Sequence, residues 1–201
     1  MKDSYLPELK VDRKTGSEQF HNSGASLGFD ILSFWSWAYS DLASNNLRGH
    51  LAEYLVARDL GLGHGRRCEW DTCDIRTLSG IKIEVKSAAY IQTWQQERLS
   101  QITFGIAPAL GWDDINQRRT NTFERNSDAF VFCLIKHKDK NTFDPVNLEQ
   151  WVFFVIATSV LNEKLGNQKT LSLDKLLSLN PVECTYGNIR DSLTKVLGRQ
   201  L

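Results

Sequence analysis

The sequence has no excess of either charge and no apolar run long enough for a membrane helix. Its 201 residues contain 24 Lys and Arg against 24 Asp and Glu, so no net basic field indicates a polyanionic partner. The longest apolar stretch, Trp151 to Ala157, is too short to cross a bilayer, and Met1 to Lys10 lacks the apolar core of a signal peptide. We therefore expect a cytoplasmic protein without membrane attachment.

Cysteine and histidine are too scattered for the usual metal or disulfide motifs. The four cysteines contain no CxxC pair, and none of the four histidines belongs to a recognisable metal-binding pair. Reduced, partly buried thiols are the expected state. A glycine-rich phosphate loop and a GxSxG elbow are also missing, which leaves a small-molecule hydrolase or transferase without support.

What the sequence does contain is an ordinary globular composition with a clear order of helices and strands. The hydrophobic fraction is 41% and the charged fraction 24%, as in soluble proteins. Residues 1–27 lack periodicity and predict a flexible arm, whereas residues 28–201 predict a single domain.

Hydrophobic periodicity assigns the elements of that domain. Asn45 and Asn46 are candidate caps for the second helix, and residues 112–128 read as an exposed polar connection. The predicted fold class is α/β or α+β, with a central mixed sheet flanked by helices. The expected helices are 29–38, 47–60, 159–165, 173–179 and 188–197, and the expected strands are 68–77, 81–88, 102–107, 129–135 and 151–157.

Two acids and a lysine are expected to meet on a hairpin within this sheet. Residues 81–86 alternate apolar and charged side chains, so Glu84 and Lys86 project from one face of a strand. Asp74 lies across the preceding turn and would approach Glu84 on the same face. Two carboxylates beside one ammonium repel each other unless a cation joins them, which predicts a Mg²⁺ site.

The chemistry of such a site follows from its ligands. Asp74, Glu84 and the backbone carbonyl of Val85 would hold Mg²⁺, with Mn²⁺ as a substitute, and the metal would activate water against a phosphodiester. Lys86 would orient that water or stabilise charge on the phosphate. Asp71 is the second choice for the metal, because it should point to the other strand face. The alternative is an ordinary exposed Glu-Lys pair, which the hairpin pattern by itself leaves open.

A further carboxylate, Glu53, favours the metal site over that alternative. It belongs to the helix predicted over 47–60, which is apolar or small on nearly all sides and should be largely buried. A buried carboxylate is costly unless it is paired or faces a metal. Pairing with Arg48, or with a partner that the sequence does not reveal, is one solution. The small neighbours Gly49 and Ala57 would instead let Glu53 reach the hairpin as a fourth catalytic residue.

In combination, these residues resemble the PD-(D/E)XK nuclease superfamily, including small bacterial proteins with the restriction-endonuclease-like fold. The resemblance implies that Glu53 is the helical acid and Asp74 the hairpin acid. Cys73 stands where many relatives have proline. The matching segments are Arg48 to Glu53, Asp74 and Ile83 to Ser87, with Glu84 and Lys86 as the signature pair and Ser87 and Gln92 as candidate polar neighbours of the site.

The resemblance also implies a substrate. A Mg²⁺-dependent nuclease, and more specifically an endonuclease, would act on DNA, with duplex favoured over single strands. The aromatic helix could join two copies into a homodimer. The alternative is a catalytically inactive nucleic-acid-binding module of the same fold. Candidate contacts to DNA phosphates are Lys82, Arg98, Arg118, Arg119 and Arg125, with Arg118 and Arg119 preferred.

Overall fold

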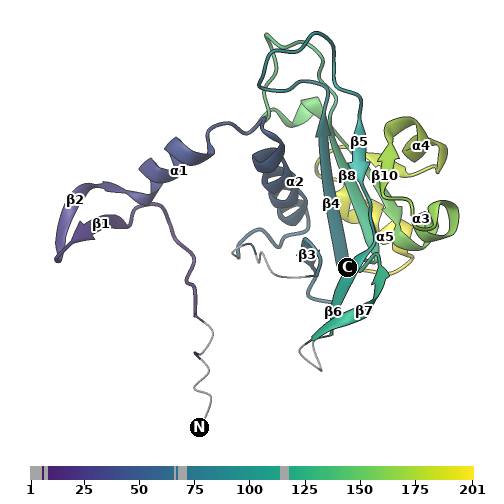
Figure 1. The fold of residues 1–201 in the computed structure, drawn as a ribbon, viewed down its shortest axis with the longest axis horizontal. Helices are drawn as coiled ribbons and strands as arrows, with labels where there is room; N and C mark the ends of the chain where they lie inside the picture. The colour runs from purple at the N-terminus through teal and green to yellow at the C-terminus, as the bar shows by residue number, and fades with distance from the viewer. Residues whose placement is uncertain (1–5, 7–8, 66, 68–71, 114–117) are drawn as a thin grey trace. The chain divides into compact units, whose positions relative to one another are not determined.

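The chain divides into two compact units, Met1–Ser40 and Asp41–Leu201. The aromatic helix predicted from the sequence lies within the first of these units. Within the described part of the chain, no helix combines the length and apolarity that a bilayer span requires. The computed structural model describes residues 6, 9–65, 67, 72–113 and 118–201 (Figure 1).

The first unit contains a hairpin and a helix. Strands β1 (Gln19–Asn22) and β2 (Ala25–Asp30) pair antiparallel around Ser23 and Gly24, whose φ angles are 50° and 83°. Positive φ at both central positions matches the twist of paired strands. The prediction of an irregular arm was therefore wrong for this segment. The hairpin is polar and exposed, so its sequence lacks the apolar alternation by which a strand is recognised. Helix α1 (Ile31–Tyr39) follows, and none of its residues is buried.

The second unit is built on a five-stranded mixed sheet, as the sequence predicted. Its strand order is β11-β9-β8-β4-β3, in which β4 and β8 are parallel and the other neighbours are antiparallel. All seven residues of β8 are buried, which explains their continuous apolar run. The strands are β3 (Ile75–Arg76), β4 (Lys82–Ala89), β8 (Ala129–Ile135), β9 (Trp151–Ala157) and β11 (Val182–Cys184).

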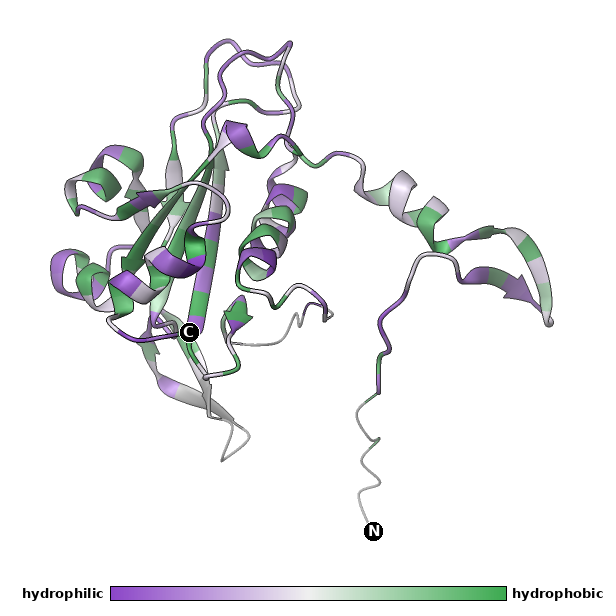
Figure 2. Cartoon of the chain, turned by 180° about the vertical axis from the view of Figure 1, so that it is seen from behind, coloured by the Kyte–Doolittle hydropathy of each residue, from purple (hydrophilic) through white to green (hydrophobic). Residues whose placement is uncertain are grey.

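Helices cover both faces of this sheet. Helices α2 (Asn45–Asp59) and α5 (Ile189–Leu197) pack on the face that contains Val131, and Figure 1 shows α2 lying along β4. Phe132 points to the opposite face, and Figure 2 shows the hydrophobic strands between the layers. That opposite face is covered by α3 (Thr158–Leu165), α4 (Leu173–Ser178) and the strand pair β5 (Thr103–Gly105) and β10 (Thr170–Ser172).

Local details differ from the expected pattern where polar residues dominate. The N-cap of α2 is Ser44, and Asn45 is already helical. The helix is buried along one face only, while Tyr54 is 53% exposed on the other. The polar connection expected over 112–128 contains part of an antiparallel hairpin. The sequence did not predict this hairpin, because its Thr and Asn residues alternate without forming an apolar face. The remaining elements are β6 (Ala109–Asp113), β7 (Arg118–Glu124) and a 3-10 turn at Leu148–Gln150.

Candidate active site

Among the residues that the structure describes, the short strand β3 pairs with only part of the β4 edge. Ile75 and Arg76 lie opposite Ile83 and Lys82. One residue before β3, the Asp74 carboxylate accepts a hydrogen bond from the Val85 amide, with 2.7 Å between Oδ2 and N. The carboxylate thus takes the position that a further strand residue would occupy. Its orientation is fixed by the backbone of the predicted catalytic strand.

The same edge brings Lys86 between two carboxylates. Its Nζ lies 2.5 Å from Glu84 Oε1 and 4.0 Å from Asp74 Oδ2. The three side chains are 20–32% exposed, so they are partly shielded from water. The expected convergence of Asp74, Glu84 and Lys86 is therefore present in the structure. Ile83 and Val85 alternate with them and point into the core beneath α2, as predicted.

The proximity of these charges changes their proton affinities. Desolvation and the charge of Glu84 raise the pKa of Asp74 from 3.8 to about 6, although Lys86 and the Val85 amide lower it. Glu53 raises it further by a smaller amount. Burial lowers the pKa of Lys86, but the charge and hydrogen bond of Glu84, with Asp74 and Glu53, raise it overall. Lys86 therefore keeps its positive charge, and it lies beside Asp74, whose ionisation is unfavourable.

Glu53 is held apart from this group by an arginine. Arg67 Nε lies 2.5 Å from Glu53 Oε2, and Arg67 Nη2 lies 3.2 Å from Oε1. The alternative in which Glu53 is paired is therefore present in the structure, with Arg67 as the partner in place of Arg48. Glu53 and Asp74 line one cavity of about 320 Å³, whereas Glu84 and Lys86 are not part of its lining. Glu53 lies close enough to influence Asp74 electrostatically but is paired elsewhere.

The donor set fits a hard divalent cation held by few protein ligands. Mg²⁺ often takes one or two carboxylates and fills its remaining positions with water and phosphate oxygens. Asp74 and Glu84 supply two carboxylates beside the part of the β4 edge that β3 leaves unpaired in the described structure. A strand residue directs its N–H and C=O to the same side, so the Val85 carbonyl faces that edge as well. Among the described residues, no group of three or more His, Cys, Asp or Glu forms a metal site.

Most of the chain, including these elements and residues, matches a known family. A family model for bacteriophage T4 endonuclease IV matches residues 31–175, more than two thirds of the chain. The chain belongs to the T4 endonuclease IV family. The match extends from α1 into α4 and includes Glu53, Asp74, Glu84 and Lys86. Searches of curated proteins and of solved structures gave no match.

Two of the predicted polar neighbours lie on another side of β4 in this T4 endonuclease IV family member. Ser87 follows Lys86 and therefore points toward α2, where it lines a cavity of about 430 Å³ together with Gln92. Gln92 is buried and accepts a hydrogen bond from Arg48. Neither residue contacts the two carboxylates within the described part of the structure. Their expected place beside the acids is thus corrected to a neighbouring cavity.

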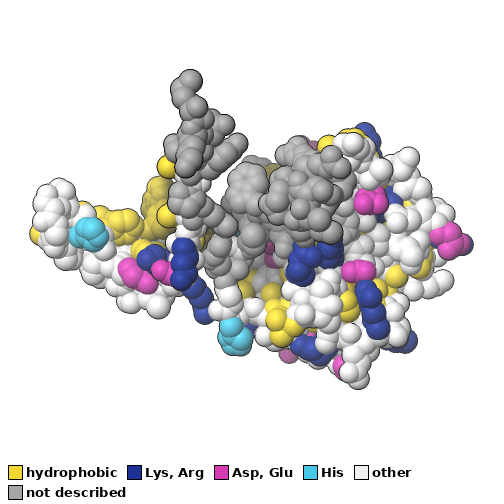
Figure 3. Space-filling model, turned by 90° about the horizontal axis from the view of Figure 1, so that it is seen from below, with side chains coloured by type: hydrophobic (Ala, Val, Ile, Leu, Met, Phe, Trp, Pro, Cys, Tyr) yellow, Lys and Arg dark blue, Asp and Glu magenta, His cyan; other side chains and the backbone are white. Residues whose placement is uncertain are grey.

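Among the predicted phosphate contacts, the structure speaks against one, and the others stay predictions. Asp71 and the side chains of Arg118 and Arg119 lie outside the described residues. Arg125 is buried, and it donates to the Ile106 carbonyl at 2.8 Å and to Asn162 Oδ1 at 2.7 Å. That arginine joins two parts of the fold and is unsuited to contacting DNA, which corrects the prediction. On the described part of the face in Figure 3, side chains of both charges are interspersed with apolar ones.

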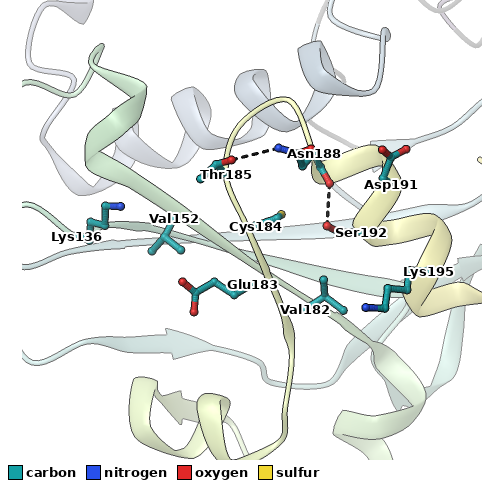
Figure 4. A pocket seen from close by; sticks show the side chains of 10 residues that line it. All are labelled: Lys136, Val152, Val182, Glu183, Cys184, Thr185, Asn188, Asp191, Ser192 and Lys195. Carbon is teal, nitrogen blue, oxygen red and sulfur yellow. Dashed lines mark hydrogen bonds between the residues drawn. The ribbon is translucent and has the colours of Figure 1, made fainter.

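A separate cavity of about 530 Å³ lies at the opposite edge of the sheet, beside β11 and α5. Figure 4 shows its lining, in which Thr185 accepts a hydrogen bond from the Asn188 amide and Ser192 donates to the Asn188 carbonyl. None of the predicted site residues lines it. The family match ends before most of its lining residues, so this cavity is not part of the candidate site.

Sequence reasoning missed two arginine contacts of this family member. Arg67 lies in a stretch without periodicity, and only the fold brings it to Glu53. Arg48 was considered only as a partner of Glu53, yet it is 4% exposed and faces Gln92 instead. A charged residue within the buried stripe of α2 was the available signal for a special environment at Arg48.

Proposed function

We propose that this chain is a metal-dependent endonuclease that hydrolyses phosphodiester bonds of DNA. The observation that carries the proposal is the convergence of Asp74, Glu84 and Lys86 beside the β4 edge, within a chain of an endonuclease family. The same residues support the finer assignment to the PD-(D/E)XK superfamily. Two acids and a lysine at the edge of a central sheet are what that superfamily's signature requires.

Asp74 and Glu84 are the proposed carboxylate ligands of Mg²⁺, with Mn²⁺ as a substitute and the Val85 carbonyl as a third oxygen. When bound, the cation would polarise a phosphoryl oxygen and lower the pKa of a coordinated water. Asp74 is held for this role by the Val85 amide at 2.7 Å. Because its pKa is raised to about 6, the carboxylate is ionised at neutral pH but carries a desolvation cost that a cation would relieve.

Lys86 is the proposed electrostatic catalyst. Its ammonium contacts Glu84 at 2.5 Å, and its raised pKa keeps it protonated throughout the neutral range. A fixed cation beside the reacting phosphate stabilises the negative charge that accumulates in the transition state. Lys86 would also orient the attacking water through a donated hydrogen bond. The partial burial of the lysine strengthens both effects, since less water screens its charge.

Glu53 is the proposed fourth acid of the site, although it pairs with Arg67. Its carboxylate shares a cavity with Asp74, so an exchange of the Arg67 guanidinium for a cation or a cation-bound water requires only side-chain movement. In that arrangement Arg67 would be released toward the substrate phosphate.

The alternative proposal is a nucleic-acid-binding module of the same fold that lacks catalysis. The ion pairs of Glu53 with Arg67 and of Glu84 with Lys86 favour it, because both acids already have a cation as partner. The raised pKa of Asp74, which persists despite Lys86 and the Val85 amide, favours the enzyme, because a module without a metal gains nothing from a carboxylate that is costly to ionise.

A cleavage assay separates these two proposals. Purified protein is incubated with plasmid, linear duplex and single-stranded DNA in Mg²⁺, Mn²⁺ or EDTA, alongside Glu84→Ala and Lys86→Ala. Metal-dependent cutting that both variants lose supports the enzyme and this site. Cutting that both variants retain would reject the site, and binding without cutting of any substrate would favour the module. The plasmid arm separates internal cleavage from degradation at ends.

The proposed homodimer is a prediction for α1. This helix has no charged residue and no buried residue, and Trp37 is 85% exposed. An uncharged apolar face can pair with its own copy around a two-fold axis without charge conflict. Sedimentation of the full chain and of Trp37→Asp tests the dimer. If the wild-type protein is monomeric at micromolar concentration, the proposed homodimer is rejected.

A further inference from the structure

A buried guanidinium near the proposed active site has no acidic partner among the described residues. Arg48, in the first turns of α2, is 4% exposed. Its Nη2 lies 2.6 Å from Asn45 Oδ1, and its Nη1 lies 3.0 Å from the Ala43 carbonyl and 3.4 Å from Gln92 Oε1. All three acceptors are neutral. A desolvated cation that is surrounded by neutral dipoles is only partly compensated.

A second buried arginine shows that neutral partners alone do not indicate a ligand. Arg125 is 8% exposed and donates to four neutral oxygens, including the Gly166 carbonyl at 2.8 Å and the Gln168 carbonyl at 2.9 Å. Its role in joining loops to α3 explains its burial. Arg48 differs because its buried Nε has no hydrogen-bond partner in the described structure, and because the residue lines a cavity.

That cavity has the chemistry of an anion site. It measures about 430 Å³ and is lined by residues from the first turn of α2, from the end of β4 and from the segment that follows β4. Figure 1 shows where these elements lie in the fold. The first amides of a helix lack intrahelical acceptors and carry a partial positive charge. The N-cap of α2, Ser44, makes no side-chain capping bond, and the first turn contains no acid. The side chains that line the cavity include Asn45, Arg48, Ser87, Gln92, Trp94 and Ser100.

The lining supplies hydrogen-bond donors that a phosphate could use. The 3.4 Å bond from Arg48 to Gln92 is long, so a better acceptor would replace it easily. The hydroxyls of Ser87 and Ser100 and the amide of Asn45 add neutral donors. The nearest acid before the helix, Asp41, is exposed, accepts from the Ser44 amide at 3.1 Å and does not line the cavity.

We propose that this cavity binds a phosphate group of the nucleic acid strand, with the Arg48 guanidinium as its central contact. The inference rests on the proposed nuclease function and extends it to the binding of the substrate. Ser87, which lines the cavity, lies directly after Lys86 on β4, so the cavity is adjacent to the proposed active site. A phosphate held there fixes the position of the strand relative to the reacting bond. Trp94, which is 54% exposed at the same cavity, offers a surface for the adjoining sugar or base. Arg48 is thus a substrate-positioning residue.

A single exposed substitution tests this site without disturbing the core. Asn45→Asp places a carboxylate on the Arg48 guanidinium, where Nη2 and Oδ1 are now 2.6 Å apart. The variant should fold at least as well as wild type, because the acid also suits the helix N-terminus. Its matched control is Asn46→Asp, which adds the same charge to the same helix end but does not line the cavity.

Binding is measured in EDTA, so that no strand is cut. A short fluorescein-labelled DNA, as duplex and as single strand, with a 5′-phosphate or a 5′-hydroxyl, is titrated at several salt concentrations. We expect Asn45→Asp to weaken binding about tenfold and to lower the salt slope by about one, with a much smaller effect of Asn46→Asp. If the loss occurs only with the 5′-phosphate strand, the cavity binds the terminal phosphate and not an internal one.

A second measurement uses inorganic phosphate as the probe. Its addition should shift the Nε–H resonance of Arg48 in nitrogen-15 spectra of wild type and leave that of Asn45→Asp unchanged. Equal DNA binding by both variants, or an Arg48 signal that ignores phosphate, would overturn the inference. This outcome is independent of the proposed function. If the protein cuts DNA but Asn45→Asp and Asn46→Asp bind DNA equally, the phosphate site is rejected and the nuclease function stands. If Asn45→Asp weakens binding as expected but the wild-type protein never cuts DNA, the nuclease function is rejected and the phosphate site stands.

Discussion

Replacement of Asp74 by asparagine should stabilise the metal-free protein at neutral pH. Desolvation and the neighbouring Glu84 raise the pKa of Asp74 from 3.8 to about 6, a shift that corresponds to about 3 kcal/mol for the ionised form. The side chain is 20% exposed, so solvent screens little of this cost. An asparagine oxygen can still accept the Val85 amide at the β4 edge. Asp74→Asn therefore removes the cost and keeps the hydrogen bond.

The effect has a defined pH dependence. Below pH 4 Asp74 is protonated in the native protein and largely protonated in the unfolded chain, so the variant gains little. Between pH 4 and 6 the native state holds the proton more tightly than the unfolded state, and wild-type stability falls as the pH rises. Above pH 6 the full difference is reached. We expect Asp74→Asn to be more stable than wild type by up to about 3 kcal/mol at pH 7 and nearly equal at pH 4.

Urea unfolding in EDTA at pH 4, 5, 6, 7 and 8 measures this difference. Asp128→Asn is the matched control, since Asp128 Oδ2 also accepts a β4 amide, that of Lys82, at 2.8 Å. Asp128 is paired with Arg199 and should gain nothing, with a loss below about 1 kcal/mol. Added Mg²⁺ should stabilise wild type more than Asp74→Asn, because it binds the ionised carboxylate. If Asp74→Asn is no more stable than wild type at pH 7, the electrostatic description of the site is incorrect.

Three further predictions concern other parts of the molecule. Lys86→Met should lower the cleavage rate by about 10²- to 10⁴-fold, whereas Lys82→Met on the same strand face should retain it; equal losses in single-turnover assays would deny Lys86 a special role. Glu53→Gln should reduce cleavage about 100-fold, but Arg67→Met, which breaks the same ion pair and keeps the carboxylate, should remain within about tenfold. Comparable losses of cleavage in both variants would show that Glu53 acts only through its ion pair with Arg67. Phe132→Ala, at a fully buried position, should cost about 3–5 kcal/mol in urea unfolding, and a smaller cost would show that this core layer collapses around the gap.

Much of the candidate site was predictable from local patterns. The alternation in β4 placed Glu84 and Lys86 on one strand face and Ile83 on the other, because successive side chains of a strand point in opposite directions. The turn before β4 brought Asp74 into reach. The apolar runs at Ala129–Ile135 and Trp151–Ala157 likewise predicted the central strands, since both are buried on two faces. Periodicity is sufficient for these features because each depends on neighbours in sequence.

Contacts between distant segments were decided only by tertiary structure. The pairing of Glu53 with Arg67, the separation of Gln92 from the two carboxylates and the burial of Arg48 all depend on how α2 packs against β4. Strand β3 begins at Ile75, so Asp74 accepts the Val85 amide with its side chain and not through backbone pairing. The sequence by itself determined which residues carry charge and on which strand face they lie. Packing determined which of those charges found a partner, because partner choice depends on distance and desolvation that no local pattern contains.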